Sequence, residues 1–204
     1  MKILNLFAGI GGNRTLWGDK HNIIAIENNQ QIAMIYHKRF PNDKVIIGDA
    51  YKYNLENYTE FDFIWASPPC FTHSKLQHCQ KIKQYPDLRL YELILFLKHF
   101  FWGKWVVENV DGYYKLLKPI KIGRHLFWSN FSIPQKKFKY HGKKGGYPNL
   151  NIKELRKIKM VEDDLLLNKG YETRKVLRNM VDPYIGRYIF KCLNKKQKSI
   201  IEVY

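Results

Sequence analysis

The chain has 204 residues, of which 45% are hydrophobic, and its formal net charge at neutral pH is +17. This length and composition predict one globular domain with a hydrophobic core and exclude a disordered chain. Three cysteines (Cys70, Cys79 and Cys192) cannot form a paired disulfide framework, and none has metal-ligand spacing. With no secretory signal and no apolar run of transmembrane length, the sequence predicts a reducing intracellular compartment and no structural metal.

Short apolar runs alternate with longer amphipathic segments through the first two thirds of the chain. We expect strands over residues 2–6, 23–26, 44–47, 61–66 and 104–107, and helices over residues 30–40 and 86–101. This order predicts the α/β class, with a doubly wound, mostly parallel sheet and helices on both faces. Beyond residue 123 we expect a strand over 124–133, an irregular basic insert over 135–151, and helices over 155–167, 171–181 and 185–193.

The positive charge is concentrated between residues 112 and 153, where the chain has no Asp or Glu and many aromatic residues. Basic side chains neutralise phosphates and aromatic rings stack on bases, so this segment predicts a nucleic-acid-binding face. The alternative is an ordinary solvated basic surface. The candidate phosphate contacts in this segment are Lys136, Lys137, Lys139, Lys143 and Lys144.

A glycine-rich turn at residues 7–12 follows the first predicted strand. Its spacing is not that of the dinucleotide fingerprint, and the chain has no phosphate-binding Gly-Lys-Ser/Thr motif, so an adenosine ligand without phosphates fits better. Glu27 ends the second strand, where a carboxylate accepts hydrogen bonds from ribose hydroxyls, and Asp49 follows the third, placed to accept from an adenine amino group. A turn of purely structural purpose is the alternative for the glycines alone.

Two further strands each end at a reactive side chain. Ser67-Pro68-Pro69-Cys70 follows the run at 61–66, and Glu108-Asn109-Val110 follows the run at 104–107. Because the carboxyl ends of neighbouring parallel strands meet at one edge of a sheet, the sequence predicts a nucleophile and an acid side by side. The alternative to a nucleophilic role is that Cys70 is simply a small buried hydrophobic residue.

The order of these motifs resembles that of the DNA cytosine-5 methyltransferase family. The matching pieces are the turn at 7–12, Glu27, Gly48-Asp49, the segments at 67–70 and 108–110, and residues 178–183. The last piece resembles the closing Gly-Asn-x-Val-x-Pro motif of the family, with Arg178 in place of glycine. The resemblance extends from residue 2 to about residue 193. It indicates a compact member, of the kind that phages and small restriction or orphan systems carry.

The resemblance implies a fold, a cofactor and roles for particular residues. It implies the S-adenosylmethionine-dependent methyltransferase fold, S-adenosyl-L-methionine as donor, S-adenosyl-L-homocysteine as product, no metal, and double-stranded DNA as substrate. The donor-binding residues would be Phe7, Ala8, Gly9, Gly11, Gly12, Glu27, Asn28, Asp49, Ala50, Pro69, Asn179 and Val181. The catalytic residues would be Cys70, Glu108 and Arg124, and the nucleic acid would also contact Ser74 and Lys75 in a mobile loop after Cys70.

The same resemblance divides the chain into a catalytic domain (1–134), a small basic target-recognition insert (135–168) and C-terminal helices that close the catalytic domain (169–204). It places the protein in the cytoplasm of a bacterial or phage-infected cell, or in the nucleus if the source is eukaryotic or viral, without a membrane partner. A partner protein that supplies specificity is compatible with so small an insert.

The chemistry explains why these residue types are needed. Carbon 5 of cytosine is a poor nucleophile until a thiolate adds at carbon 6, which makes Cys70 the expected nucleophile. Glu108 would offset the charge that develops at ring nitrogen 3, and the base would have to leave the duplex first. We expect Arg124, the donor sulfonium and nearby helix amino ends to lower the pKa of the Cys70 thiol.

The chain departs from the family pattern in two places. The Gln-x-Arg-x-Arg motif is not intact, so Arg124 would position the anion alone or together with His125. The recognition region between residues 134 and 168 is short, which predicts a short or relaxed recognition sequence and affinity dominated by phosphate contacts. Two other functions stay open: cytosine-5 methylation of RNA, as in the tRNA-methylating branch of the family, and a non-catalytic nucleic-acid-binding relic.

Overall fold

The computed structural model describes all residues except 76–78, 114, 139–149, 163–169 and 194–204. Its centre is a seven-stranded sheet of order β3-β2-β1-β4-β5-β7-β6. The strands are β1 (Lys2–Leu6), β2 (Asn22–Glu27), β3 (Lys44–Ile47), β4 (Phe63–Ala66), β5 (Lys104–Val110), β6 (Ile120–Ile122) and β7 (His125–Ser129). The first five are parallel, whereas β7 runs antiparallel to both β5 and β6. The predicted α/β class and mostly parallel sheet are therefore confirmed.

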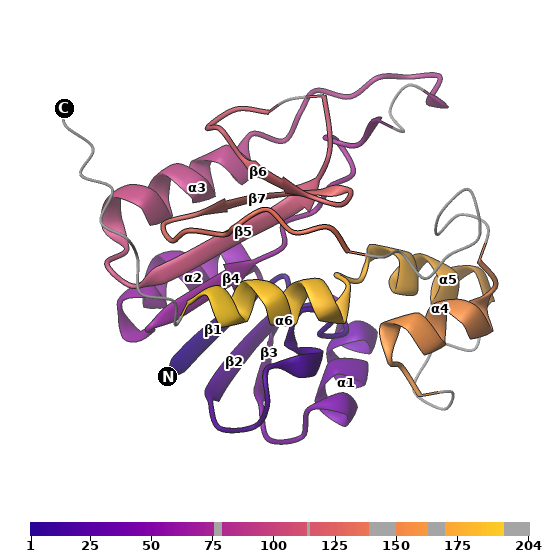
Figure 1. The fold of residues 1–204 in the computed structure, drawn as a ribbon, viewed down its shortest axis with the longest axis horizontal. Coiled ribbons are helices and arrows are strands. Elements are labelled where there is room, and N and C mark those ends of the chain that lie inside the picture. The colour runs from indigo at the N-terminus through magenta and orange to yellow at the C-terminus, as the bar shows by residue number, and fades with distance from the viewer. Residues whose placement is uncertain (76–78, 114, 139–149, 163–169, 194–204) are drawn as a thin grey trace.

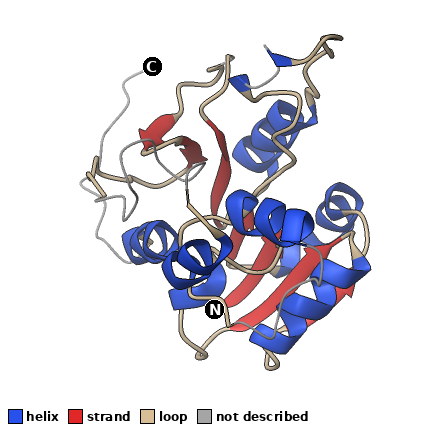
Figure 2. Ribbon diagram, turned by 90° about the vertical axis from the view of Figure 1, so that its right-hand side faces the viewer, coloured by secondary structure: helices blue, strands red, loops and turns tan. Residues whose placement is uncertain are grey.

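Helices cover both faces of the sheet (Figure 2). They are α1 (Gln30–Arg39), α2 (Ala50–Asn57), α3 (Arg89–Phe100), α4 (Ile152–Lys159), α5 (Gly170–Asn179) and α6 (Pro183–Cys192), with short 3₁₀ helices at Arg14–Leu16 and Tyr58–Glu60. Helices α4 and α5 lie together at one end of the molecule, next to α1 and away from α3 (Figure 1).

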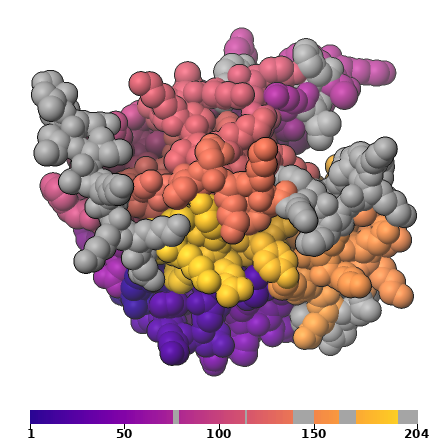
Figure 3. Space-filling model, viewed as in Figure 1, coloured from indigo at the N-terminus to yellow at the C-terminus, as the bar shows by residue number. Residues whose placement is uncertain are grey.

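The alternation of side chains along the strands explains this arrangement. Leu4 and Leu6 of β1 point to the core that α3 covers, and Ile3 points to the opposite core, which contains Ile185 and Ile189 of α6. Both cores consist of fully buried apolar side chains, as expected for a parallel sheet covered on two sides. In Figure 3 the surface of α6 lies between the N-terminal segments and the segment that follows β7.

Several boundaries differ from the sequence prediction. Helix α3 begins at Arg89, not at residue 86, and the strand expected over 124–133 is only His125–Ser129. Helix α4 begins earlier than predicted, at a capping box formed by Asn151 and Glu154, and ends at Met160, which has a positive φ of 54°. The remainder of that predicted helix, residues 163–167, lies outside the described residues. The sequence prediction missed α2 and β6.

Candidate active site

A cavity of about 990 Å³ opens at the carboxyl ends of β1, β2, β4 and β5. Ligands of open α/β sheets bind at this edge. The two sites predicted from the sequence, one for a donor and one for a nucleophile, line this single cavity. The predicted residues that line it are Phe7, Ala8, Gly9, Gly12, Glu27, Asn28, Asp49, Ala50, Pro69, Cys70, Ser74, Lys75, Glu108, Arg124, Asn179 and Val181.

The glycine-rich turn is held against the closing segment at 179–181. A Cβ added to Gly12 would lie 2.3 Å from Cγ of Met180 and 2.4 Å from the carbonyl oxygen of Val181. Only glycine allows this approach, which brings two segments far apart in the sequence to one wall of the cavity. Gly11 does not line the cavity, because it faces the rings of Tyr36 and Phe40 at φ +78°.

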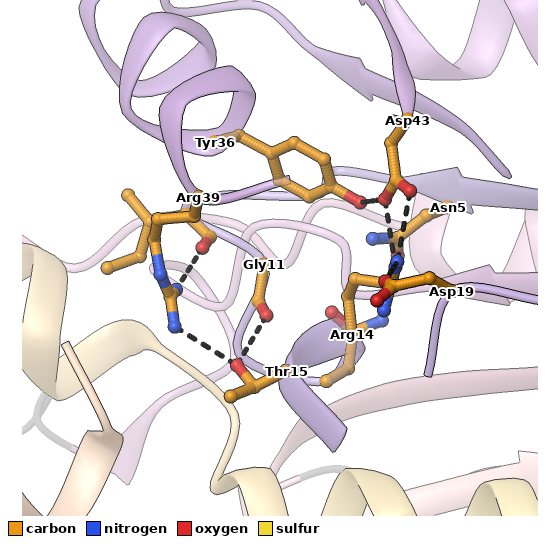
Figure 4. A network of polar contacts seen from close by, with 10 residues as sticks. Asn5, Gly11, Arg14, Thr15, Asp19, Tyr36, Arg39 and Asp43 are labelled. Carbon is orange, nitrogen blue, oxygen red and sulfur yellow. Dashed lines mark hydrogen bonds and ion pairs between the residues drawn. The ribbon is translucent and has the colours of Figure 1, made fainter. Parts of the chain in front are cut away.

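A polar network behind the turn holds it in place (Figure 4). The buried Arg14 guanidinium donates to both carboxylate oxygens of Asp43, at 2.9 and 3.1 Å, and the Tyr36 hydroxyl donates to Asp43 at 2.8 Å. Burial lowers the pKa of the Arg14 guanidinium, but hydrogen bonds to Asp43 and Asp19 outweigh that effect and leave it raised. A buried ion pair with its hydrogen bonds satisfied fixes geometry, because breaking either partner leaves an uncompensated charge.

Arg39 of α1 extends this network to the turn itself. Its guanidinium donates to the carbonyl oxygen of Ile10, to Oγ1 of Thr15 at 3.1 Å and to the carbonyl oxygen of Met160 at 3.2 Å. Thr15 in turn donates to the carbonyl oxygen of Gly11 at 2.9 Å. Burial lowers the pKa of Arg39 to about 10, so it remains charged at neutral pH.

The two acidic residues predicted at strand ends lie at the same end of the cavity. The buried carboxylate of Glu27 accepts hydrogen bonds from the backbone N–H groups of Gly9 and Asn29, each at 2.9 Å. Asp49 caps α2, because its Oδ1 accepts from the backbone N–H groups of Tyr51 and Lys52 at 2.8 and 3.1 Å. Within the part of the chain that the structure describes, Oδ2 of Asp49 accepts no hydrogen bond, so it remains an acceptor for a ligand.

Cys70 follows β4 at the start of a tight turn. Its carbonyl oxygen accepts from the backbone N–H groups of His73 and Ser74, at 3.1 and 3.0 Å. Burial, and then the negative charge of Glu108, raise the pKa of the Cys70 thiol, and Arg124 opposes them. In the protein without a ligand this pKa is therefore raised: Arg124 acts in the expected direction but is outweighed, and the lowering expected with the donor bound stays a prediction.

Glu108 lies in β5, the strand next to Cys70. Its neighbour Asn109 donates from Nδ2 to the carbonyl oxygen of Pro68 at 3.0 Å, which ties the end of β5 to the turn that carries Cys70. Oε1 of Glu108 contacts Nδ1 of His125, and Nε of Arg124 donates to Nε2 of the same imidazole at 3.3 Å. Nη2 of Arg124 also donates to the carbonyl oxygen of Arg178 at 2.8 Å.

Basic side chains that the sequence prediction missed line the same cavity. Arg174, Lys175 and Arg178 come from α5, and Arg89 comes from the start of α3. Arg89 pairs with Asp87 at 2.6 Å, and the predicted Lys75 lies 3.5 Å from Asp111. The signal that would have found the α5 residues is their spacing, because Arg178 lies four residues from Arg174 and three from Lys175, and residues three or four apart in a helix share a face.

The predicted basic segment is only partly described. Nζ of Lys136 lies 4.9 Å from the ring centre of Tyr188 and 5.5 Å from that of Phe138, and Lys137 is exposed; neither lines the cavity. Lys139, Lys143 and Lys144 lie outside the described residues. Among the described residues, no group of three or more His, Cys, Asp or Glu side chains is placed to hold a metal ion. None of the helices described is long and apolar enough to span a membrane.

One known protein family matches more than half of the chain. Residues 1–118 match the model of the family "C-5 cytosine-specific DNA methylase". No match was found among curated protein sequences.

Solved structures with the same architecture come from several sources. The methyltransferase EhMeth of Entamoeba histolytica has a TM-score of 0.64 and 12% identity over 95% of this chain and 97% of that one. A putative DNA modification methyltransferase from an Escherichia coli prophage has a TM-score of 0.62 and 13% identity, over 96% of this chain and 100% of that one. A mutant of Spodoptera frugiperda DNMT2 has a TM-score of 0.62 and 13% identity, over 95% of this chain and 99% of that one. At these identities the likeness shows the shared methyltransferase fold.

Proposed function

This chain belongs to the C-5 cytosine-specific DNA methylase family, and from that premise we propose that it methylates carbon 5 of cytosine in double-stranded DNA, with S-adenosyl-L-methionine as donor. One observation carries the proposal. Cys70, in the turn that follows β4, and Glu108, on the neighbouring parallel strand β5, line the same cavity as Glu27 and Asp49. A nucleophile, an acid and two acceptors for an adenosine share one enclosed space.

The residues at one end of the cavity fit the donor. Asp49 offers an acceptor oxygen for an adenine amino group, and Glu27 lies where its carboxylate can also accept from ribose hydroxyls. The ring of Phe7 packs edge-on against Tyr51 with centroids 4.8 Å apart and provides an apolar wall. A Cβ at Gly9 would meet no atom within 4 Å, so the turn leaves open space on this side. The donor supplies an electrophilic methyl group and a positive charge on its sulfur.

The residues at the other end act on the cytosine. Sγ of Cys70 adds to carbon 6, the C5–C6 π bond breaks, and the electron pair at carbon 5 takes the methyl group. Glu108 supplies a proton to ring nitrogen 3 and so offsets the negative charge of the adduct. The donor leaves as S-adenosyl-L-homocysteine. A base then takes the proton from carbon 5, the C5–C6 double bond forms again as Cys70 leaves as a thiolate, and the proton on ring nitrogen 3 returns to Glu108. Because the thiol pKa is raised in the free protein, we expect the substrate complex to lower it before attack.

The cations at the cavity mouth fit a phosphate backbone. Lys75, Arg89, Arg174, Lys175 and Arg178 come from three separate segments and line the cavity. Phosphate contacts of this kind give affinity and position but no sequence information. With so short an insert, we propose a short or relaxed recognition sequence, to which a partner protein can add specificity.

We propose the division into a catalytic part (1–134), a recognition insert (135–168) and closing helices (169–204), with one qualification. Leu155 of α4 and Val161 share a core with Ile10 and Ile35, next to the glycine-rich turn. Helix α4 therefore supports the donor end of the cavity, and recognition falls to the residues of the insert that precede it.

Transfer of labelled methyl groups to duplex DNA and to tRNA tests the proposal, with a Cys70→Ala variant as control and bisulfite sequencing to locate the product. Methylated cytosine in DNA, absent from the Cys70→Ala reaction, supports it. Methyl transfer to tRNA but not to DNA would show that the substrate is RNA, since phosphate contacts do not distinguish the two nucleic acids. No transfer to either nucleic acid, together with absence of donor binding, refutes the proposed activity and favours a non-catalytic binding protein.

A further inference from the structure

His125 is a buried imidazole in the cavity that the mechanism so far leaves unused. It is the first residue of β7, which runs antiparallel to β5 with Phe127 opposite Glu108 and His125 opposite Val110. Side chains two apart in a strand share a face, so His125 lies diagonally across from Glu108 on the cavity side. The imidazole is 7% exposed and the carboxyl 6%, and both line the cavity.

The hydrogen bonds of His125 determine which ring nitrogen carries the proton. The Nε group of Arg124 can only donate, so Nε2 of His125, at 3.3 Å, is the acceptor. A neutral imidazole with Nε2 as acceptor has its N–H at Nδ1, and this group donates to Oε1 of Glu108. The charged or titratable side chains that line the cavity with this ring include Arg124, Glu108 and Cys70.

We propose that His125 is a positioning residue for Glu108 in the methyl-transfer reaction; this inference rests on the proposed function. By holding Oε1, the Nδ1–H group leaves Oε2 directed to the pyrimidine. Oε2 accepts no hydrogen bond from the residues that the structure describes. The reaction requires that Glu108 carries a proton on Oε2 once the cytosine is bound; when this proton passes to ring nitrogen 3, the carboxylate that remains is negatively charged. The bond from Nδ1–H then becomes charge-assisted and stronger, so His125 stabilises the adduct more than the ground state.

Two variants separate this role from simple filling of the core. His125→Asn keeps an N–H donor, because the side-chain amide nitrogen of Asn is as many bonds from the backbone as Nδ1 is. His125→Leu keeps apolar volume and removes the donor. His99→Asn, on the exposed side of α3, is the matched control. The assays use the full chain with duplex DNA: single-turnover methyl transfer, covalent trapping by DNA that contains 5-fluorocytosine, and donor affinity by calorimetry.

We expect His125→Leu to slow methyl transfer and trapping by about 100-fold or more, the usual effect of removing one donor to a developing negative charge. Donor affinity should stay within about threefold, because His125 lies at the pyrimidine end of the cavity. His125→Asn should recover at least about tenfold of that loss, and His99→Asn should match the wild type. An active wild type whose rate is unchanged by His125→Leu, or whose loss is not recovered by Asn, overturns the role of His125. An inactive wild type refutes the proposed function instead.

Nitrogen NMR of the labelled wild-type protein tests the geometry without a measurement of activity. The expected result is one histidine with its proton on Nδ1 and an Nε2 that accepts a hydrogen bond, assigned by loss of the signal in His125→Asn. A neutral His125 ring with its proton on Nε2 would overturn the proposal, since Nδ1 would then have no proton to donate to Glu108.

Discussion

The buried ammonium of Lys159 makes the stability of this protein depend on pH in a direction that can be calculated. Lys159 is the last residue of α4 and only 1% exposed, and its Nζ donates to the carbonyl oxygen of Met180 at 2.7 Å. Burial lowers the pKa of Lys159 to about 8, with Asp182 opposing the shift and Arg124 adding to it. A lysine whose pKa falls on folding costs stability while both states are charged, and this cost is relieved as pH rises.

The size of the effect follows from the two pKa values. The difference between the ordinary value of 10.5 and about 8 corresponds to about 3 kcal/mol, the full cost at pH values well below 8. Between about pH 7 and about pH 9.5 the folded state loses the proton while the unfolded state largely keeps it. About 2 kcal/mol of the cost is therefore relieved in this window.

Urea unfolding of the wild type and of Lys159→Met, at a series of pH values, measures this relief. We expect the free energy of unfolding of the wild type, relative to that of the variant, to rise by about 2 kcal/mol from about pH 7 to about pH 9.5. Lys157→Met removes the same charge from the exposed side of the same helix and should show no such rise. A flat difference between wild type and Lys159→Met would mean that the ammonium is not buried as described.

Three further outcomes follow from the site. Gly12→Ala places a methyl group against the closing segment, so it should lower the free energy of unfolding by about 1–3 kcal/mol and weaken donor binding measured by calorimetry. In the control Gly48→Ala the added methyl group meets no atom within 4 Å, so this variant should unfold like the wild type. Alkylation of Cys70, followed by mass spectrometry in the free protein, should have a midpoint above the free-thiol value of about 8.5, since burial raises its pKa; a midpoint below that value contradicts the buried geometry. Replacing Arg174 and Lys175 together by alanine should reduce the salt dependence of DNA binding by about two counterions and weaken binding equally for all sequences, and an unchanged slope would remove α5 from the nucleic-acid face.

The sequence was sufficient for those parts of the site in which one local pattern carries the information. Apolar runs located the parallel strands, and the residues within four positions after the runs fell at the carboxyl edge of the sheet, so Glu27, Asp49, Cys70 and Glu108 all line one cavity. Their order along the chain does not depend on any contact between distant segments. For parallel strands joined by helices, the topology follows almost directly from that order.

Prediction failed where a local pattern was weak or had two explanations. Helix α2 buries only Ala50 and Asn54, so it has little of the apolar periodicity that marks a helix. Its best signal is its N-cap, Asp49, which the sequence analysis assigned to a ligand alone although the side chain serves the helix as well. The strand β6 has three residues, which is too short for an alternating pattern to be recognised.

Contacts between distant segments, which no local pattern reveals, explain two differences from the prediction: the raised pKa of the Cys70 thiol and the packing of α4 against the closing segment. The pKa of Cys70 depends on how deeply the turn is buried and on Glu108, which is distant in sequence, whereas the expectation counted only Arg124, the donor sulfonium and nearby helix amino ends. In the same way, α4 belongs to the predicted insert by position, yet Lys159 bonds to the closing segment and Arg39 bonds to Met160 at the end of α4. These bonds attach the insert to the donor end of the cavity. A chain with so short an insert can hold its closing segment in place because α4 takes part in that support.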